Sequence, residues 1–201
     1  MFDSWGLLLL GSVSCDPGGE EVLSGLEEFK GVAAYERLKA FLSLGPRVAG
    51  TPGAERAADW LYDQSRALGW DAHVDSWRET TVAGRVTFHN VVARLGVDEH
   101  DEFILLGSHF DTKNLPDIPD FQGANDSGSS TAVLLEVMRV LEANRGRLAV
   151  GVECVFFDGE ECREQYGEHD GLHGSRRHVE RLRQEGRLDQ CRAMILLDMV
   201  G

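Results

Sequence analysis

The sequence predicts an α/β protein: a three-layer α/β/α sandwich around a mixed, mostly parallel β-sheet. Three observations lead to this prediction. Three short runs are continuously apolar, which is typical of strands buried on both faces of a parallel sheet. Segments with helical spacing of apolar residues separate these runs, and alternation of strand and helix indicates parallel connections. Two earlier segments alternate apolar and polar residues around a turn, so we expect them to add antiparallel strands.

Two helices are predicted before the sheet. Apolar residues keep helical spacing over residues 20–44, and Gly45 with Pro46 ends this helix. The second helix begins at Thr51, where a proline follows in the first turn, and it ends before Gly69.

The remainder of the chain supplies the sheet and its covering helices. The strands are expected at residues 70–78, 85–95, 103–107, 150–157 and 194–197. The helices between them are expected at residues 128–143 and 173–184.

Composition limits the classes of function. The chain has 201 residues, 42% of them hydrophobic, which is enough for one domain with a real core, expected at residues 21–201. Its 34 acidic residues outnumber its 20 basic residues, which gives a net charge of −14. Nucleic-acid binding needs a basic face, so nucleic acid is not expected as a partner. The longest early apolar run, Trp5 to Leu10, is too short to span a bilayer.

Residues 1–20 form a candidate export segment. The run Trp5 to Leu10 is followed by Cys15, which stands where a bacterial lipid-attachment cysteine would stand, and then by a tether. Against this, the segment before the run contains Asp3 and no lysine or arginine. We expect a periplasmic or lipid-anchored bacterial protein; a cytoplasmic protein with no targeting segment is the alternative.

Acidic or imidazole side chains directly follow each of the three apolar runs. A further aspartate stands just before the helix predicted at 128–143. The residues after the runs are His109, Asp111, Asp158, Glu160, Glu161 and Asp198, and the aspartate before the helix is Asp126. Ligand sites of open α/β sheets lie at the carboxyl ends of the strands, so we expect these side chains to converge there.

This cluster predicts a divalent metal site. Several carboxylates held close together would take up protons unless a cation neutralised them. Histidine and carboxylate ligands without a thiolate suit Zn²⁺, and less specifically Mn²⁺ or Co²⁺. Each residue taken alone has an ordinary explanation: a structural histidine, a helix N-cap at Asp126, or a surface pair of glutamates. Their occurrence together at several strand ends favours the metal site.

Two sequence relationships suggest separate roles within the cluster. Glu160 and Glu161 are adjacent, so their side chains point in different directions. One can then bind metal while the other faces the substrate as a general acid/base, although spacing does not say which. Asp111 lies two residues after His109, on the same side of an extended chain, and can hold the other imidazole nitrogen.

The order of these motifs resembles that of the zinc aminopeptidase superfamily. The resemblance runs from about Gly45 to Gly201. It rests on the segments 107–111, 123–128, 156–161, 171–176 and 197–201. The superfamily includes bacterial di-zinc aminopeptidases and the glutaminyl-peptide cyclotransferases, so the resemblance implies a zinc-exopeptidase-like fold.

The resemblance also implies roles for the clustered residues. Asp126 anchors the metal, and His109 and Asp198 complete a first site with it. Glu161 is a ligand of a second site that shares Asp126, and Glu160 is the general base. Asp198 also supports proton movement or metal position.

The second site of the superfamily uses a histidine that would lie downstream of Gly201. The resemblance therefore implies one or two zinc ions and a fold whose C-terminal part is missing from this chain. For residues 1–201 alone we expect weak zinc binding, self-association through an apolar edge strand at 194–197, and no cyclase activity.

Details of the sequence resemble the cyclotransferase branch. Nine residues, 162–170, separate the glutamate pair from the Gly-Leu-His-Gly-Ser turn, whereas ordinary aminopeptidases pass almost directly between them. Tyr166 falls where the cyclotransferases place a tryptophan of the substrate pocket. The segments 47–53 and 109–113 also look like this branch.

The leading interpretation is a zinc-dependent acyltransferase that converts the N-terminal Gln of peptides or proteins into pyroglutamate and releases ammonia. The substrate's own α-amine attacks the side-chain amide, and Glu160 transfers the proton. The alternative is a di-zinc aminopeptidase, in which Glu160 serves a water activated by the metal. A non-catalytic binding domain of the same fold is a second alternative, disfavoured because Glu160 and the expected ligands are present.

Overall fold

The computed structural model of the chain describes residues 29–97 and 102–201. The candidate export segment at 1–20, and residues 20–28 of the first predicted helix, lie outside the described residues. None of the helices in the described ranges is long and apolar enough to cross a membrane.

The described residues form a five-stranded mixed sheet in the order β1-β2-β4-β3-β5. The strands are β1 (Asp71–Thr81), β2 (Gly84–Leu95), β3 (Phe103–His109), β4 (Gly151–Phe157) and β5 (Cys191–Leu196). β1 with β2 and β2 with β4 pair antiparallel, while β3 pairs parallel with both β4 and β5. Each strand lies where the sequence predicts one, although β5 begins three residues before the predicted start.

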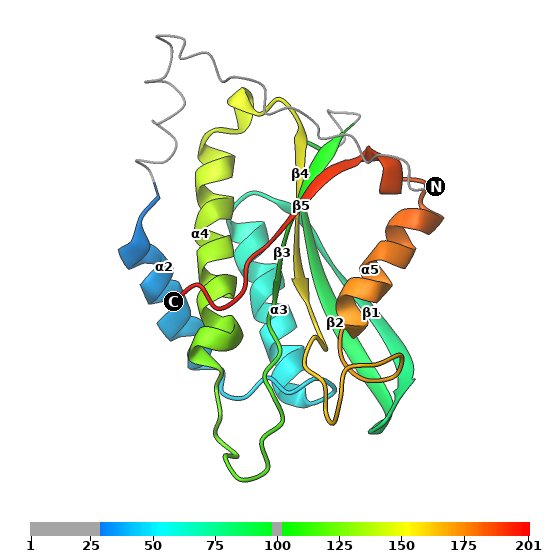
Figure 1. Cartoon of the computed structure of the whole chain (residues 1–201). Coiled ribbons are helices and arrows are strands. Elements are labelled where there is room, and N and C mark those ends of the chain that lie inside the picture. The colour runs from blue at the N-terminus through cyan, green and yellow to red at the C-terminus, as the bar shows by residue number, and fades with distance from the viewer. Residues whose placement is uncertain (1–28, 98–101) are drawn as a thin grey trace, which may run out of the picture.

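Helices cover both faces of this sheet (Figure 1). They are α2 (Gly31–Leu42), α3 (Pro52–Ala67), α4 (Ser130–Ala143) and α5 (His173–Gln184). α3 and α4 pack on one face, α5 packs on the other, and α2 lies against α4. The predicted three-layer α/β/α sandwich with a mixed sheet is confirmed.

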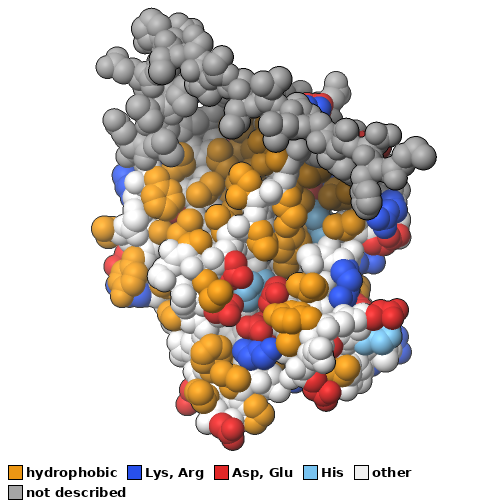
Figure 2. All heavy atoms as spheres, in the orientation of Figure 1, with side chains coloured by type: hydrophobic (Ala, Val, Ile, Leu, Met, Phe, Trp, Pro, Cys, Tyr) orange, Lys and Arg blue, Asp and Glu red, His pale blue; other side chains and the backbone are white. Residues whose placement is uncertain are grey.

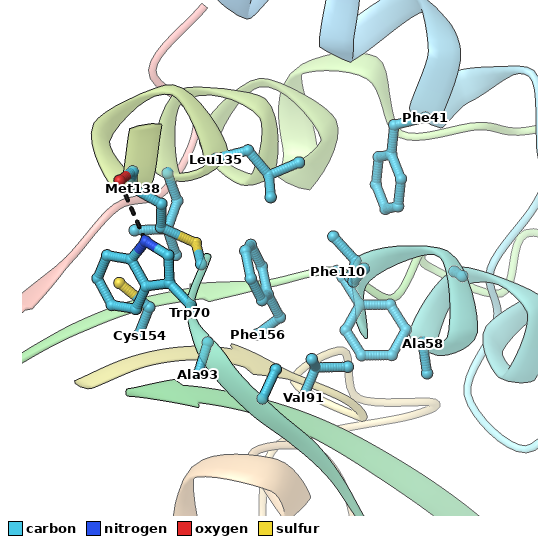
Figure 3. Close-up of a cluster of buried hydrophobic side chains, with 14 of the residues drawn as sticks. Phe41, Ala58, Trp70, Val91, Ala93, Phe110, Leu135, Met138, Cys154 and Phe156 are labelled. Atoms are coloured by element: carbon cyan, nitrogen blue, oxygen red, sulfur yellow. Dashed lines mark hydrogen bonds between the residues drawn. The ribbon is translucent and has the colours of Figure 1, made fainter. Parts of the chain in front are cut away.

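The main hydrophobic core fills the space between the sheet and helices α3 and α4 (Figure 3). Trp70 is buried in this core beside Met138, and its indole Nε1 donates a hydrogen bond to the carbonyl of Met138 at 3.1 Å. Phe156 of β4 faces this core, while its neighbours Val155 and Phe157 belong to a smaller core with Leu182 of α5. Burial on both faces explains why the β4 sequence is almost continuously apolar.

The direction of the strands determines where polar groups can gather. β3, β4 and β5 run parallel, so their carboxyl ends lie at one edge of the sheet. In the register of β3 with β4, His109 lies opposite Phe157, the last residue of β4. The polar residues that follow each strand therefore emerge next to one another.

β5 forms one edge of the described sheet and exposes apolar side chains. Met194, Ile195 and Leu196 are 51%, 51% and 58% exposed. Figure 2 shows hydrophobic side chains gathered on this face, beside the acidic residues of the cluster. The apolar strand at 194–197 is thus an edge strand, as expected from the sequence.

We expect the 201-residue chain to self-associate as its concentration rises, because exposed apolar edge strands pair with other chains. Ile195→Lys should shift the equilibrium toward monomer, because a charge on the edge opposes pairing. Val179→Lys is the control, since Val179 is 42% exposed on α5 and away from the edge. Sedimentation velocity over a concentration series measures the effect. A chain that remains monomeric throughout would contradict the expectation.

Candidate active site

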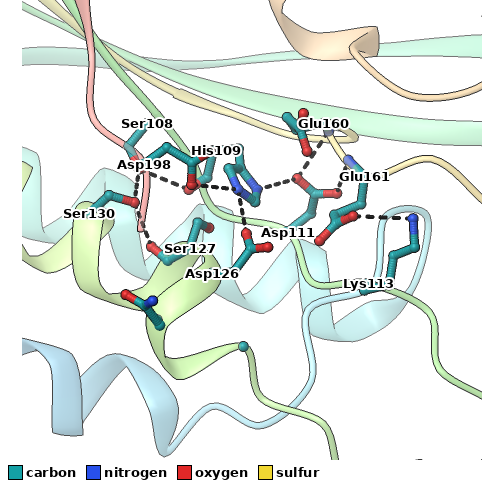
Figure 4. Close-up of polar contacts among 12 residues, drawn as sticks. Ser108, His109, Asp111, Lys113, Asp126, Ser127, Ser130, Glu160, Glu161 and Asp198 are labelled. Atoms are coloured by element: carbon teal, nitrogen blue, oxygen red, sulfur yellow. Dashed lines mark hydrogen bonds and ion pairs between the residues drawn. The ribbon is translucent and has the colours of Figure 1, made fainter. Parts of the chain in front are cut away.

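The predicted site residues converge at the carboxyl ends of the parallel strands (Figure 4). His109 is the last residue of β3, and Asp111 follows it by two positions. Glu160 and Glu161 come from the segment after β4, and Asp198 comes from the segment after β5. Asp126 belongs to the tight turn Ala124–Ser129 that precedes α4.

Three of these residues could hold one metal ion. The Nε2 atom of His109 lies 2.9 Å from Oδ1 of Asp126 and 3.6 Å from Oδ1 of Asp198. The ligand atoms of all three residues lie within 4.8 Å of one another. One imidazole nitrogen and two carboxylate oxygens fit the donors that Zn²⁺ takes in proteins and leave a coordination position for a substrate. The donor set present in the chain therefore fits a divalent cation.

Asp111 orients the imidazole of His109. Its buried Oδ1 atom lies 3.4 Å from Nδ1 of the ring, which leaves Nε2 facing Asp126. Burial alone would lower the pKa of His109, but the hydrogen bonds to Asp111 and Asp126 outweigh it and raise the pKa to about 11. Without a cation the imidazole is therefore protonated at neutral pH, and its proton neutralises part of the acidic cluster.

Asp111 also joins β3 to the segment that follows β4. Its Oδ1 atom accepts the backbone N–H of Glu160 at 3.1 Å, and its Oδ2 atom accepts that of Glu161 at 3.2 Å. The same buried carboxylate thus sets the position of the histidine and of both glutamates.

The two glutamates point to different partners. Both carboxylate oxygens of Glu160 accept from the hydroxyl of Tyr166 at 3.3 Å, whereas Glu161 pairs with Lys113 at 3.3 Å. Burial raises the pKa of each glutamate; Asp111 adds to this effect, and a nearby cation opposes it in each case. A raised carboxyl pKa is what a general acid/base needs near neutral pH. Glu161 lies outside the three-ligand cluster.

Asp126 does not cap the helix that follows it. α4 begins at Ser130, four residues later, and its N-cap position is Ser129. The alternative explanation of Asp126 as an N-cap is therefore wrong, and at this distance the helix dipole contributes little to its ionisation. The pKa of Asp126 is lowered mainly by the hydrogen bond from His109, with burial opposing.

The inserted segment 162–170 forms an ordered turn beside Glu160. The carboxylate of Asp170 accepts three backbone N–H groups, from Arg163, Glu164 and Gln165, at 2.6 to 3.0 Å. This turn places Tyr166, which is half exposed, against Glu160.

Lys113 is not among the predicted site residues, but the structure places it among the acidic side chains. Its ammonium pairs with Glu161, donates to the carbonyl of Cys162, and lies 5.9 Å from the ring centre of Tyr166. Lys113 lies two residues after Asp111 in a segment already identified as part of a motif. The sequence feature that could have indicated its role is a positive charge at the end of a segment whose other charged or titratable residues are an aspartate and a histidine.

Fold and site together define a class of protein: an α/β/α sandwich with a His/Asp/Asp cluster and a separate glutamate pair at the parallel strand ends. The sequence profile of peptidase family M28 matches residues 90–201, which is more than half of the chain. The chain belongs to peptidase family M28. The resemblance to the zinc aminopeptidase superfamily, and to its cyclotransferases, is confirmed.

Similar proteins and structures carry the names of cyclotransferases. A glutaminyl-peptide cyclotransferase of Drosophila melanogaster is 32% identical over 160 residues, which cover 78% of this chain and 45% of that protein. The structure of an Acidobacteriales bacterium glutaminyl cyclase matches with a TM-score of 0.76 at 31% identity, over 87% of this chain and 60% of that chain. For the Porphyromonas gingivalis glutaminyl cyclase the TM-score is 0.72 at 30% identity, over 87% and 61%. This chain thus spans less than two thirds of each.

Metal binding should release about one proton per ion at pH 7, because a cation displaces the proton that His109 holds with a pKa of about 11. Below that pKa the affinity should rise by up to about tenfold per pH unit. Calorimetric titration with Co²⁺ in two buffers of different ionisation enthalpy counts the protons.

A test variant and a control variant show whether the released proton comes from His109. His109→Asn should abolish the proton release, whereas His178→Asn, on the opposite face of the sheet beside Glu153, should leave it unchanged. Binding without proton release by the unaltered chain would show that His109 is not the displaced acid.

Proposed function

We propose that the whole protein is a zinc-dependent glutaminyl-peptide cyclotransferase, which converts an N-terminal Gln into pyroglutamate and releases ammonia. The observation that carries this proposal is Glu160, a carboxyl group of raised pKa beside the His/Asp/Asp cluster and in contact with the inserted turn at Tyr166. The cyclotransferases among the similar proteins support it.

In this proposal His109, Asp126 and Asp198 hold the first zinc ion. Glu161 is a further ligand in the whole protein, once its carboxylate leaves Lys113. Bound at this edge, zinc would supply a Lewis acid for the side-chain amide carbonyl of the substrate. A second ion, in this proposal, would share Asp126 and Glu161.

Glu160 is positioned to move the proton that cyclisation requires. The substrate's α-amine attacks its own side-chain amide carbon, so the reaction is intramolecular and gains from proximity. A C–N bond forms to the α-nitrogen, and the bond to the amide nitrogen breaks. Glu160 accepts the proton that the α-amine loses and returns it to the departing nitrogen, which leaves as ammonia. Its raised pKa suits both steps.

In this proposal the inserted turn at 162–170 lines one side of the substrate pocket. Tyr166 exposes half of its side chain while its hydroxyl donates to Glu160, so a substrate that contacts the ring also lies beside the proton-transfer group. The preferred partners in this proposal are the N-termini of peptides or proteins, and the compartment is extracytoplasmic.

The alternative is hydrolysis of the first peptide bond by an aminopeptidase. The match to a peptidase family favours it, and the same ligands and the same Glu160 would serve both reactions. The ordered turn 162–170 beside Glu160 favours the cyclase instead. The non-catalytic binding domain is disfavoured, because a glutamate of raised pKa beside the candidate ligands is what a general acid/base requires.

Mass spectrometry separates the two reactions directly. The whole protein loaded with zinc, given a peptide that begins with Gln, should reduce the peptide mass by one ammonia. Loss of a complete N-terminal residue would establish the aminopeptidase, and an unchanged peptide at full zinc occupancy would contradict both activities.

Exchanging each glutamate tests the division of roles. Glu160→Gln should retain metal but lower turnover by about 10²- to 10⁴-fold, the usual contribution of a general acid/base. Glu161→Gln should lower metal affinity. Metal content by atomic emission and initial rates provide the two measurements. Loss of metal by the Glu160 variant with full loading of the Glu161 variant would reverse the assignment.

A further inference from the structure

Arg47 is a fully buried cation near the site that neither the metal cluster nor the proposed proton transfer uses. Its side chain is 0% exposed, and within the described ranges it forms no ion pair with a carboxylate. Burial lowers the pKa of the guanidinium to about 10, and the charge of Asp111 opposes this effect. Burying a charge without an ion-pair partner is unfavourable, so other contacts must compensate.

The compensating contacts join three segments that are far apart in the sequence. The guanidinium donates to the carbonyl of Phe110 at 2.7 Å, to that of Gly45 at 3.4 Å and to that of Gly123 at 3.5 Å. Its carbon Cζ also lies 4.3 Å from the ring centre of Phe41. Arg47 thus links the end of α2, the end of β3 and the turn before α4.

Two of these segments carry metal-ligand candidates. Phe110 stands between His109 and Asp111, so its carbonyl belongs to the backbone that aims both side chains. The backbone of Arg47 adds to this attachment, because it exchanges two hydrogen bonds with Thr112, at 3.0 and 3.3 Å.

Gly123 begins the turn that presents Asp126. Its φ of +52° lies in the left-handed region, and an added Cβ would come within 2.1 Å of the carbonyl oxygen of Asp126. This turn is therefore tightly folded, and a contact at Gly123 restrains the position of Asp126.

We propose that Arg47 is a positioning residue for the metal site. By bonding Phe110 and Gly123 at once, it fixes His109 and Asp126 relative to each other, with Nε2 and Oδ1 2.9 Å apart. Lysine cannot replace it, because a single ammonium lacks the planar fork of five N–H donors that reaches several carbonyls. This inference rests on metal binding at the proposed site, but not on the cyclase activity.

Arg187 provides a matched control. Its guanidinium also lies over a phenylalanine, 4.8 Å from the ring centre of Phe103, and it bonds the buried Glu153 beneath α5. Its side chain is 15% exposed, so it is a largely buried arginine packed on a ring, as Arg47 is, although it pairs with a carboxylate. It lies on the opposite face of the sheet from α2 and α4 and, among the described residues, contacts no segment of the site.

The test compares Arg47→Met, Arg47→Lys and Arg187→Met with the unaltered protein. Unfolding is measured first, and Co²⁺ affinity and the visible Co²⁺ spectrum are then measured well below each transition. Both Arg47 variants should bind Co²⁺ about 10- to 100-fold more weakly, as loss of ligand-orienting contacts does, with an altered spectrum. Arg187→Met should lose stability but keep the affinity and the spectrum.

Hydrogen exchange of the metal-free proteins supplies an independent measurement. Peptides covering residues 109–113 and 123–127 should exchange faster in Arg47→Lys than in the Arg187 control, even if Arg47→Met fails to fold. If the unaltered protein binds no Co²⁺, the proposed metal site is wrong, and hydrogen exchange alone decides the positioning role. Unchanged affinity and exchange in a folded Arg47→Lys protein, or equal losses in Arg187→Met, would overturn the proposal.

Discussion

The carboxylate of Asp111 is buried where β3 and β4 end, and it forms hydrogen bonds with residues at the ends of both strands. It lies against Nδ1 of His109 and accepts the N–H groups of Glu160 and Glu161. The imidazole of His109 and the backbones of the two glutamates therefore share one anchor. A buried carboxylate is unfavourable unless its oxygens accept hydrogen bonds. Each of these contacts therefore helps to keep the carboxylate in place, and so stabilises the other contacts that it makes.

The second constraint is the excess of negative charge around this anchor. Asp126 and Asp198 approach the same imidazole nitrogen, and the pKa values of both glutamates rise on burial. In the metal-free chain the proton of His109 and the ammonium of Lys113 balance part of this charge. A divalent cation held by this cluster would balance the charge more completely, because the carboxylates would no longer compete for protons.

The sequence allowed most of the fold to be predicted because strand burial and helix spacing are local signals. The bounds of α5 matched the prediction, and the convergence of His109 with Asp198 followed from parallel strands alone. Contacts made across the fold could not be predicted. Nothing in the spacing of Glu160 and Glu161 indicated which would contact Tyr166 and which Lys113. The turn that holds Asp126 also extends past the predicted helix start at residue 128, so that α4 begins at Ser130. The buried guanidinium of Arg47 gives no local signal, because its partners are backbone carbonyls of remote segments.

The central claim is that His109, Asp126 and Asp198 close around one metal ion. Diffraction from zinc-loaded crystals, collected on both sides of the zinc absorption edge, tests it without reference to any reaction. The account predicts an anomalous peak about 2.0–2.2 Å from Nε2 of His109 and from a carboxylate oxygen of each aspartate. A peak that excludes His109, or zinc held elsewhere while the His109–Asp126 contact of 2.9 Å persists, would contradict it.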